Sequence, residues 1–91
     1  MPVKALKIEV LGRVQGVSFR VGAEKRALEL GIGGWIKNNQ NGGVDVWAEG
    51  PERNLQKFLQ WCYNGSEEAA VESVESSGQA PAGYKDFSII R

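Results

Sequence analysis

The stretch GRVQGVSFR, residues 12–20, places two glycines and two arginines within nine residues. Gly12 and Gly16 can adopt backbone angles that are closed to other residues, which lets successive N–H groups converge on one point. A following helix would add its unpaired N-terminal N–H groups and the positive end of its dipole. Arg20 would sit in the first helical turn, where its planar set of donors matches phosphate oxygens. Because a cation is locally unfavourable at a helix N-terminus, Arg20 favours a bound anion in front of it.

The spacing alone leaves a second interpretation open. A phosphate-binding loop that ends in Gly-Lys-Ser/Thr is absent from the sequence. An ordinary glycine-rich turn between a strand and a helix, with an arginine on its surface, would show the same pattern. To choose between the two interpretations, we predict the neighbouring strands and helices and ask which residues they bring close to residues 12–20.

Hydrophobic periodicity predicts the elements next to the stretch. Residues 6–10 alternate between apolar and charged side chains, which indicates a half-buried strand. Residues 19–30 carry apolar side chains at helical spacing, with Ser18 as the expected N-cap and Gly31 as the left-handed stop. The sequence WIKN, residues 35–38, is typical of a second short strand.

The second half of the chain repeats this alternation of element types. A hairpin loop over 39–43 leads into a strand over 44–49, in which Asp45, Trp47 and Glu49 are expected on the solvent side. A second helix follows within residues 50–65, and Ala69–Ser76 indicates a fourth strand. The apolar stripe of that helix consists of Leu55, Phe58, Leu59 and Cys62, and Phe87, Ile89 and Ile90 mark a last short strand.

The element order predicts an α+β fold, because strand, helix, strand, strand, helix, strand is the split βαβ arrangement of the ferredoxin-like fold. We expect a single domain over residues 1–91, built as βαββαβ plus a short terminal strand. The sheet should be antiparallel in the order 4-1-3-2, with two helices on one face. In this topology the first and second strands run parallel, so their ends lie at one edge. Arg20 and Asn38 should then face each other across about 10 Å, which leaves room for a phosphate and a water.

Two motifs give the sequence a close resemblance to the acylphosphatase family. GRVQGVSFR resembles the family signature, commonly written G-R-V-Q-G-V-G-F-R. Residues 31–50 resemble the second motif, G-x-x-G-W-[VI]-[RK]-N followed by a Gly-containing turn, a strand and a Gly. The similarity continues in register to the terminal DFSIIR and covers nearly the whole chain. The one departure is Ser18, where many members carry glycine, and we do not interpret it as a loss of function.

The resemblance implies hydrolysis of acyl phosphates, the mixed anhydrides of a carboxylic acid and phosphate. It implies Arg20 and Asn38 as the catalytic residues. It also implies that the substrate phosphate is bound by Arg20 and by the backbone of Gln15, Gly16, Val17, Ser18 and Phe19. Family members are small, cytosolic, metal-free and usually monomeric. We therefore expect a cytoplasmic monomer without a metal or cofactor, with an acyl phosphate as substrate and inorganic phosphate as product and inhibitor.

The remaining residues agree with this chemistry. The chain contains no histidine, so the commonest general base is missing. Its single cysteine, Cys62, falls on an apolar helix stripe and is expected in the core. No His, Cys or carboxylate cluster has metal-ligand spacing. Because a carboxylate is a good leaving group, positioning and charge stabilisation can carry the reaction. Asn38 would hold the attacking water, and the proton would pass to a phosphate oxygen.

Composition limits the other classes of function. Eleven basic residues balance eleven acidic ones, which argues against a broad surface for nucleic acid or anionic membrane. No apolar run is long enough to span a membrane. A single-stranded RNA reader would have the same strand and helix order, but VDVWAEG offers one aromatic residue flanked by acids. A phosphate sensor, or a module of a larger carbamoyl-transfer protein, is the other alternative. A free-standing enzyme is favoured because no cysteine-rich continuation follows DFSIIR.

Overall fold

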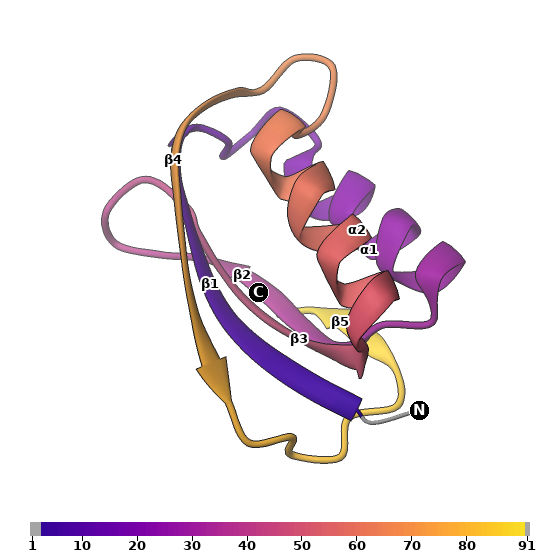
Figure 1. Ribbon diagram of the computed structural model, residues 1–91. Helices are drawn as coiled ribbons and strands as arrows, with labels where there is room; N and C mark the ends of the chain where they lie inside the picture. Colours follow the sequence, from indigo (N-terminus) through magenta and orange to yellow (C-terminus); the bar gives the residue numbers. More distant parts are fainter. Residues whose placement is uncertain (1–2, 91) are drawn as a thin grey trace.

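The computed structural model describes residues 3–90 and consists of one sheet with two helices packed on one of its faces (Figure 1). The order of elements agrees with the prediction, including the short terminal strand. The elements are β1 (Val3–Arg13), α1 (Phe19–Leu30), β2 (Gly33–Asn38), β3 (Val44–Pro51), α2 (Glu52–Asn64), β4 (Ala70–Gln79) and β5 (Phe87–Ile89).

The sheet has the strand order β4-β1-β3-β2-β5, which confirms the predicted 4-1-3-2 core. β3 runs antiparallel to both β1 and β2, so β1 and β2 are parallel to each other, as expected. Within this core every neighbouring pair of strands is antiparallel, as predicted, whereas β5, whose placement the sequence did not indicate, pairs with β2 in parallel. The chain crosses from β4 at one edge to β2 at the other before β5 begins, and it therefore enters β5 in the direction of β2 (Figure 1).

The core lies between the sheet and the helices. In α1, Phe19, Ala23 and Ala27 are buried, which places them one turn apart on a single stripe. In α2, Leu55, Phe58 and Cys62 are buried, as the sequence predicts. The inward residues of β3 are also buried, namely Val44, Val46 and Ala48. None of the helices within residues 3–90 is long and apolar enough to cross a membrane.

Glu49 lies on the outer face of the sheet, as the alternation predicts, but it is not exposed to solvent as expected. Only 3% of its surface is exposed. Its carboxylate accepts hydrogen bonds from the indole Nε1–H of Trp47 at 2.7 Å and from the backbone N–H groups of Ala82 at 2.9 Å and Gly83 at 2.7 Å. The segment that connects β4 to β5 therefore covers Glu49. Gly33 in β2 allows the same segment to approach closely, since a Cβ at that position would collide with the Tyr84 carbonyl.

Candidate functional site

The loop between β1 and α1 is built from residues of alternating handedness. Gly16 and Ser18 have positive φ values of 74° and 62°, whereas the residues on either side of each have negative values. Alternation of this kind turns successive N–H groups toward one side of the chain and forms an anion-binding concavity. Ser18 does precede α1, but its left-handed backbone differs from that of an ordinary N-cap, and its hydroxyl makes no capping hydrogen bond. The expected capping role of Ser18 is therefore wrong.

Most N–H groups of this loop have no backbone partner. The Val14 N–H donates to the Gly12 carbonyl at 3.1 Å and the Gly22 N–H donates to the Ser18 carbonyl at 3.0 Å. Between them, the N–H groups of residues 15–20 donate to no backbone carbonyl within residues 3–90. A run of unpaired backbone donors at a helix N-terminus has to be satisfied by solvent or by a ligand.

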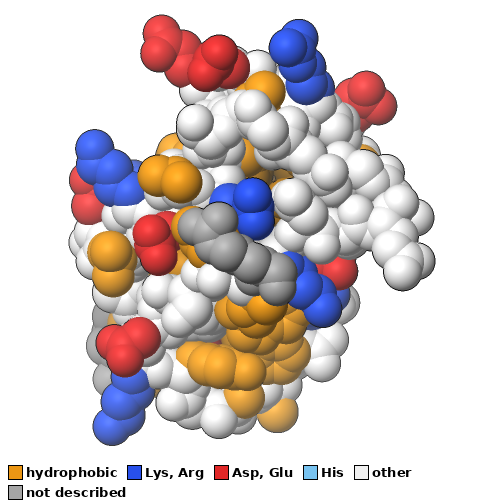
Figure 2. All heavy atoms as spheres, turned by 180° about the vertical axis from the view of Figure 1, so that it is seen from behind, with side chains coloured by type: hydrophobic (Ala, Val, Ile, Leu, Met, Phe, Trp, Pro, Cys, Tyr) orange, Lys and Arg blue, Asp and Glu red, His pale blue; other side chains and the backbone are white. Residues whose placement is uncertain are grey.

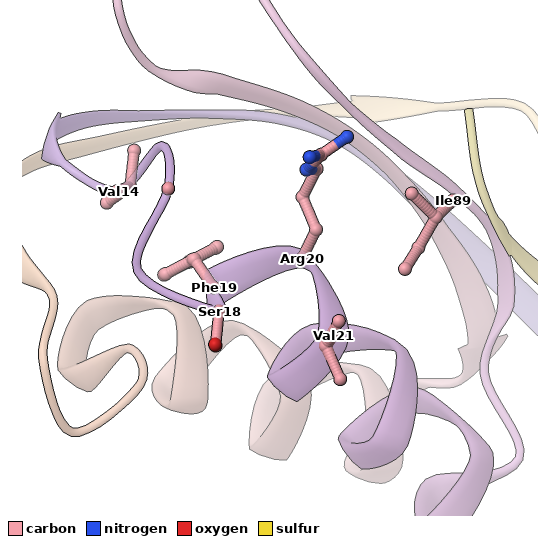
Figure 3. Close-up of a pocket in the computed structure, with 7 residues that line it drawn as sticks. Val14, Ser18, Phe19, Arg20, Val21 and Ile89 are labelled. Atoms are coloured by element: carbon pink, nitrogen blue, oxygen red, sulfur yellow. The ribbon is translucent and has the colours of Figure 1, made fainter. Parts of the chain in front are cut away.

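A cavity of about 120 Å³ opens beside the loop and is lined by Gly16, Ser18 and Arg20 together with the apolar side chains of Val14, Phe19, Val21 and Ile89. This volume exceeds the roughly 10–15 Å³ that one water needs, so it can take a small anion. The Arg20 guanidinium extends from the start of α1 toward the sheet, and Ile89 approaches it from β5 (Figure 3). The Ser18 hydroxyl points away from the guanidinium in the same view. Within residues 3–90, Arg20 forms no ion pair.

The loop between β1 and α1 packs against the core and against residues in and just after α2. Val14, Val17 and Phe19 are all buried in the core. The Phe19 ring packs on Trp61 of α2 with their centroids 5.1 Å apart, which gives Trp61 a role that its sequence position did not indicate. The Ser66 hydroxyl donates to the Val17 carbonyl at 2.8 Å, and this contact also escapes prediction because it joins segments far apart in sequence. The shape of the loop is therefore set by packing as well as by its glycines.

Asn38 is the last residue of β2 and is exposed. It does not line the Arg20 cavity. It borders a second, polar hollow together with Lys37, Gln40 and Asn41. Within residues 3–90, its side-chain amide makes no hydrogen bond, so both its donors and its acceptor face solvent. Asn38 thus has an amide that is available to a substrate or a water.

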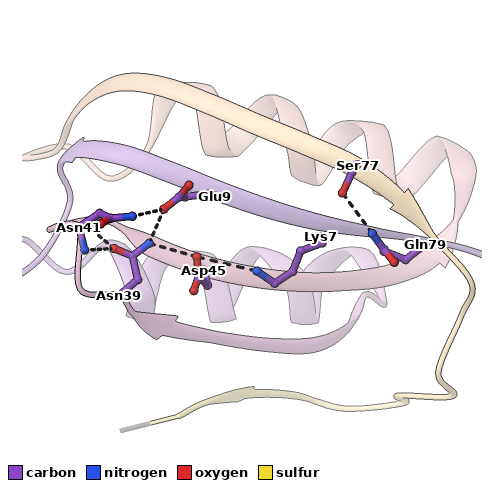
Figure 4. A network of polar contacts seen from close by, with 8 residues as sticks. Lys7, Glu9, Asn39, Asn41, Asp45, Ser77 and Gln79 are labelled. Carbon is purple, nitrogen blue, oxygen red and sulfur yellow. Dashed lines mark hydrogen bonds and ion pairs between the residues drawn. The ribbon is translucent and has the colours of Figure 1, made fainter.

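The adjacent Asn39 has the opposite character, because its side chain is committed to the fold (Figure 4). Its Nδ2 donates to Glu9 at 2.9 Å and to Asp45 at 3.0 Å, which ties the hairpin to β1 and β3. Its Oδ1 accepts from the N–H groups of Asn41 at 2.9 Å and Gly43 at 3.0 Å, which closes the turn. Of the two neighbouring asparagines, only Asn38 is therefore free to take part in chemistry.

The side chain of Gln15 connects the loop to this hairpin. Its Nε2 donates to the backbone carbonyls of Asn39 at 3.1 Å and Gly43 at 2.8 Å. The structure therefore brings residues 15–20 together in one loop and joins that loop to the residue after Asn38. The family resemblance implies a role for the backbone of Gln15 alone, and no periodic pattern could have placed its side chain on the hairpin.

The one cysteine does not line the cavity beside the loop. Cys62 is fully buried in α2, and burial raises the pKa of its thiol to about 12. No group of three or more His, Cys, Asp or Glu side chains in the part of the chain that the structure describes is placed to hold a metal ion. Side chains of both signs are interspersed over the face seen in Figure 2, with an apolar group among them.

Comparison with known proteins gives a consistent result. A family model described as Acylphosphatase matches residues 6–89. The acylphosphatase of Roseiflexus sp. (strain RS-1) is 40% identical over 91 residues, which are 99% of this chain and 98% of the relative. The crystal structure of acylphosphatase from Bacillus subtilis matches with a TM-score of 0.93 at 37% identity, covering 97% of this chain and 99% of that chain. Full-length HypF, in its phosphate- and nucleotide-bound form, matches with a TM-score of 0.92 at 25% identity over 99% of this chain and 12% of that one.

Proposed function

The chain belongs to the acylphosphatase family, and from this premise we propose that it hydrolyses acyl phosphates to a carboxylate and inorganic phosphate. One observation carries the assignment of the site. Among residues 15–20, whose N–H groups have no backbone partner in the described part of the chain, Gly16, Ser18, Phe19 and Arg20 line one cavity. Such a combination of backbone donors and a guanidinium is complementary to a phosphate group.

Arg20 and the backbone of Gln15, Gly16, Val17, Ser18 and Phe19 bind the phosphoryl group. The helix dipole of α1 and the Arg20 charge stabilise the negative charge that develops on the phosphoryl oxygens. Because these donors are fixed before the substrate arrives, little reorganisation is needed during the reaction. The apolar side chains of Val21 and Ile89 line the cavity, and the acyl group of the substrate packs against them.

Asn38 holds the attacking water through its side-chain amide. The water oxygen forms a bond to phosphorus as the bond from phosphorus to the acyl oxygen breaks, and the carboxylate leaves with that electron pair. One proton of the water passes to a phosphoryl oxygen, which yields dihydrogen phosphate. Asn38 orients this water and takes no proton, since an amide has no useful proton affinity at neutral pH. The free amide of Asn38 supports this role.

The enzyme works without a metal or cofactor, as a monomer in the cytoplasm. The charge that a metal would supply to the phosphate comes from Arg20 and the loop N–H groups. The one cysteine is buried and forms no disulfide, in keeping with a reducing compartment.

A phosphate-binding module of a larger protein is the second candidate. It is supported by the likeness to full-length HypF, of which this chain covers 12%. A module of that kind would bind phosphate without turning over a free acyl phosphate. Turnover therefore separates the two candidates.

The direct test is the timed loss of benzoyl phosphate with and without the protein, in the presence of a chelator. We expect catalysed hydrolysis that the chelator does not reduce. Absence of turnover would overturn the proposed activity, and turnover that needs an added divalent metal would overturn the proposed mechanism. Inorganic phosphate should inhibit competitively. At one hundred times its dissociation constant it should also stabilise the fold by about 2.7 kcal/mol relative to chloride of equal ionic strength.

A further inference from the structure

The two groups that the proposed mechanism needs lie on different elements. The phosphate cradle lies between β1 and α1, whereas Asn38 ends β2. Arg20 and Asn38 line separate hollows that have no lining residue in common, so no shared cavity wall fixes the distance between them. A line of attack from a held water to a held phosphorus requires that their separation be fixed, and a misplacement of 1 Å can cost about 100-fold in rate. Something must therefore couple the loop to the hairpin.

The side chain of Gln15 makes that connection. Its Nε2 donates to the carbonyls of Asn39 at 3.1 Å and Gly43 at 2.8 Å. These are the only hydrogen bonds within residues 3–90 that join residues 14–20 to residues 38–43. The other fixed contacts of the loop go to the opposite side, where Ser66 and Trp61 hold it against α2.

The hairpin transmits this restraint because it is internally rigid. The Asn39 N–H donates to the Gly43 carbonyl at 2.9 Å, so the two acceptors of Gln15 are themselves bonded across the hairpin. The Asn39 side chain closes the turn through the N–H groups of Asn41 and Gly43. Asn38 is linked to Asn39 by one peptide bond and pairs with Val44 on β3. A restraint on Asn39 and Gly43 is therefore a restraint on the backbone of Asn38.

The same bonds rule out a direct contact of the Gln15 side-chain nitrogen with substrate. A glutamine amide carries two N–H donors, and both are used on the two carbonyls. Only the backbone N–H of Gln15 is left for the phosphate. The backbone and the side chain of this residue thus serve different purposes.

We propose that Gln15 is a positioning residue, whose side chain holds Asn38 at a fixed place relative to the phosphate cradle. This inference rests on the proposed function. Removing the side-chain donors should leave the cradle intact, because Arg20 and the loop backbone remain. It should lower the turnover number, because the water held by Asn38 is no longer fixed in position relative to the phosphorus atom.

The test compares Gln15→Met, which keeps the length of the side chain and removes both donors, with wild type. We expect a fall in kcat of about 10- to 100-fold for benzoyl phosphate. The dissociation constant for inorganic phosphate should stay within about twofold, since its ligands are untouched. Gln15→Glu should lose at least as much kcat, because its carboxylate would face two carbonyl oxygens. The acidic variant also provides a second measurement if Gln15→Met folds poorly.

Two further variants separate positioning from a general loss of stability. Asn54→Ala removes a hydrogen bond of the same kind, which the Asn54 Nδ2 donates to the Leu30 carbonyl at 2.9 Å. Leu30 is at the C-terminal end of α1, whereas the loop precedes its N-terminal end. It should lower the melting temperature and leave kcat unchanged. In a protein that already carries Asn38→Ala, Gln15→Met should cost less than about twofold more in kcat, because the two residues act on the same water.

The proposal is overturned if Gln15→Met keeps normal kcat, if its loss multiplies with that of Asn38→Ala, or if phosphate binding weakens as much as turnover does. These outcomes all require an active wild type. A wild type that hydrolyses no acyl phosphate would instead overturn the proposed function, on which this inference depends.

Discussion

Arg20 and Asn38 should respond differently to truncation, because they are proposed to hold different species. Arg20→Ala should weaken phosphate binding and remove most turnover, since the proposed contact of Arg20 with the phosphoryl group is made in both the ground and the transition state. Asn38→Ala should lower kcat by about 10²- to 10³-fold, the scale seen when one positioned donor is lost, with little change in phosphate affinity. Steady-state kinetics and phosphate titration of the two variants measure both effects.

The controls for Arg20→Ala and Asn38→Ala are substitutions at Asn38 itself and in the turn that follows it. Asn38→Asp should not restore turnover, because a carboxylate offers no N–H and repels the incoming dianion. Gln40→Ala removes an exposed amide from the same turn and should turn over normally. Normal turnover of Asn38→Ala would contradict the water-holding role, and a loss of phosphate binding as severe as that of Arg20→Ala would assign Asn38 to the loop.

Ser18 gives a second prediction at the scale of one residue. Its φ of 62° is left-handed, a conformation that costs a residue with a Cβ roughly 1–2 kcal/mol and costs glycine little. Its hydroxyl makes no capping bond to offset that strain. Ser18→Gly should therefore raise the free energy of unfolding, by up to about 1 kcal/mol once the greater freedom of glycine in the unfolded chain is subtracted.

The matched control for Ser18→Gly is Ser76→Gly in the exposed edge strand β4. At that position φ is negative, so glycine relieves no strain and should lower the stability by about 0.5–1 kcal/mol. Urea unfolding of both variants compares them directly. Equal losses of stability in the two variants would show that the Ser18 backbone is not strained.

At the scale of the element, α2 provides the prediction for Cys62. Its thiol is fully buried and its pKa is raised to about 12 by burial, so it should not react with a thiol reagent at pH 8 until the protein unfolds. Cys62→Ala should remain active and lose about 1 kcal/mol of stability through the small cavity that it leaves. A folded Cys62→Ala variant without turnover would contradict the proposed mechanism.

The elements could be predicted from the sequence wherever an apolar period marks a face. Helix α1 begins at Phe19 and ends at Leu30 as its pattern indicates, and the left-handed Gly31 follows it. The order of strands followed from the split βαβ pattern. That order also placed the ends of β1 and β2 at one edge of the sheet, which is the basis for the prediction that Arg20 and Asn38 face each other; in the structure the two residues line separate hollows.

What could not be predicted depends on contacts between non-periodic segments. The three residues of β5 carry no information about direction, so the sequence left open both its parallel pairing with β2 and the place of Ile89 in the cavity. Alternation placed Glu49 on the outer face of the sheet but could not reveal the segment that buries it there. The side chain of Gln15 reaches across the fold to a hairpin, and such a contact follows only from the tertiary arrangement.

At the scale of the whole molecule, Glu49 controls how the chain returns from one edge of the sheet to the other. Burial alone would raise the pKa of its carboxyl, but hydrogen bonds from Trp47 and from the backbone of Ala82, Gly83 and Tyr84 outweigh burial and lower that pKa below 4.5. The ionised carboxylate therefore stabilises the segment that leads into β5. That segment leads to Ile89 in β5, which lines the Arg20 cavity.

Since the folded-state pKa of Glu49 is depressed, its contribution to stability is present above pH 4.5 and is lost as the pH falls through the folded-state value. Glu49→Gln should lower the free energy of unfolding at pH 7 by about 2 kcal/mol, because an amide turns an N–H toward backbone donors and loses the charge-assisted bonds. The difference from wild type should shrink steadily below pH 4.5, as wild-type Glu49 becomes protonated too. Glu68→Gln, at an exposed position, should change the stability little at either pH. Urea unfolding of wild type and both variants at pH 7 and pH 3 measures these differences. A Glu49→Gln deficit that is equally large at both pH values would show that the ionised carboxylate is not what holds the segment.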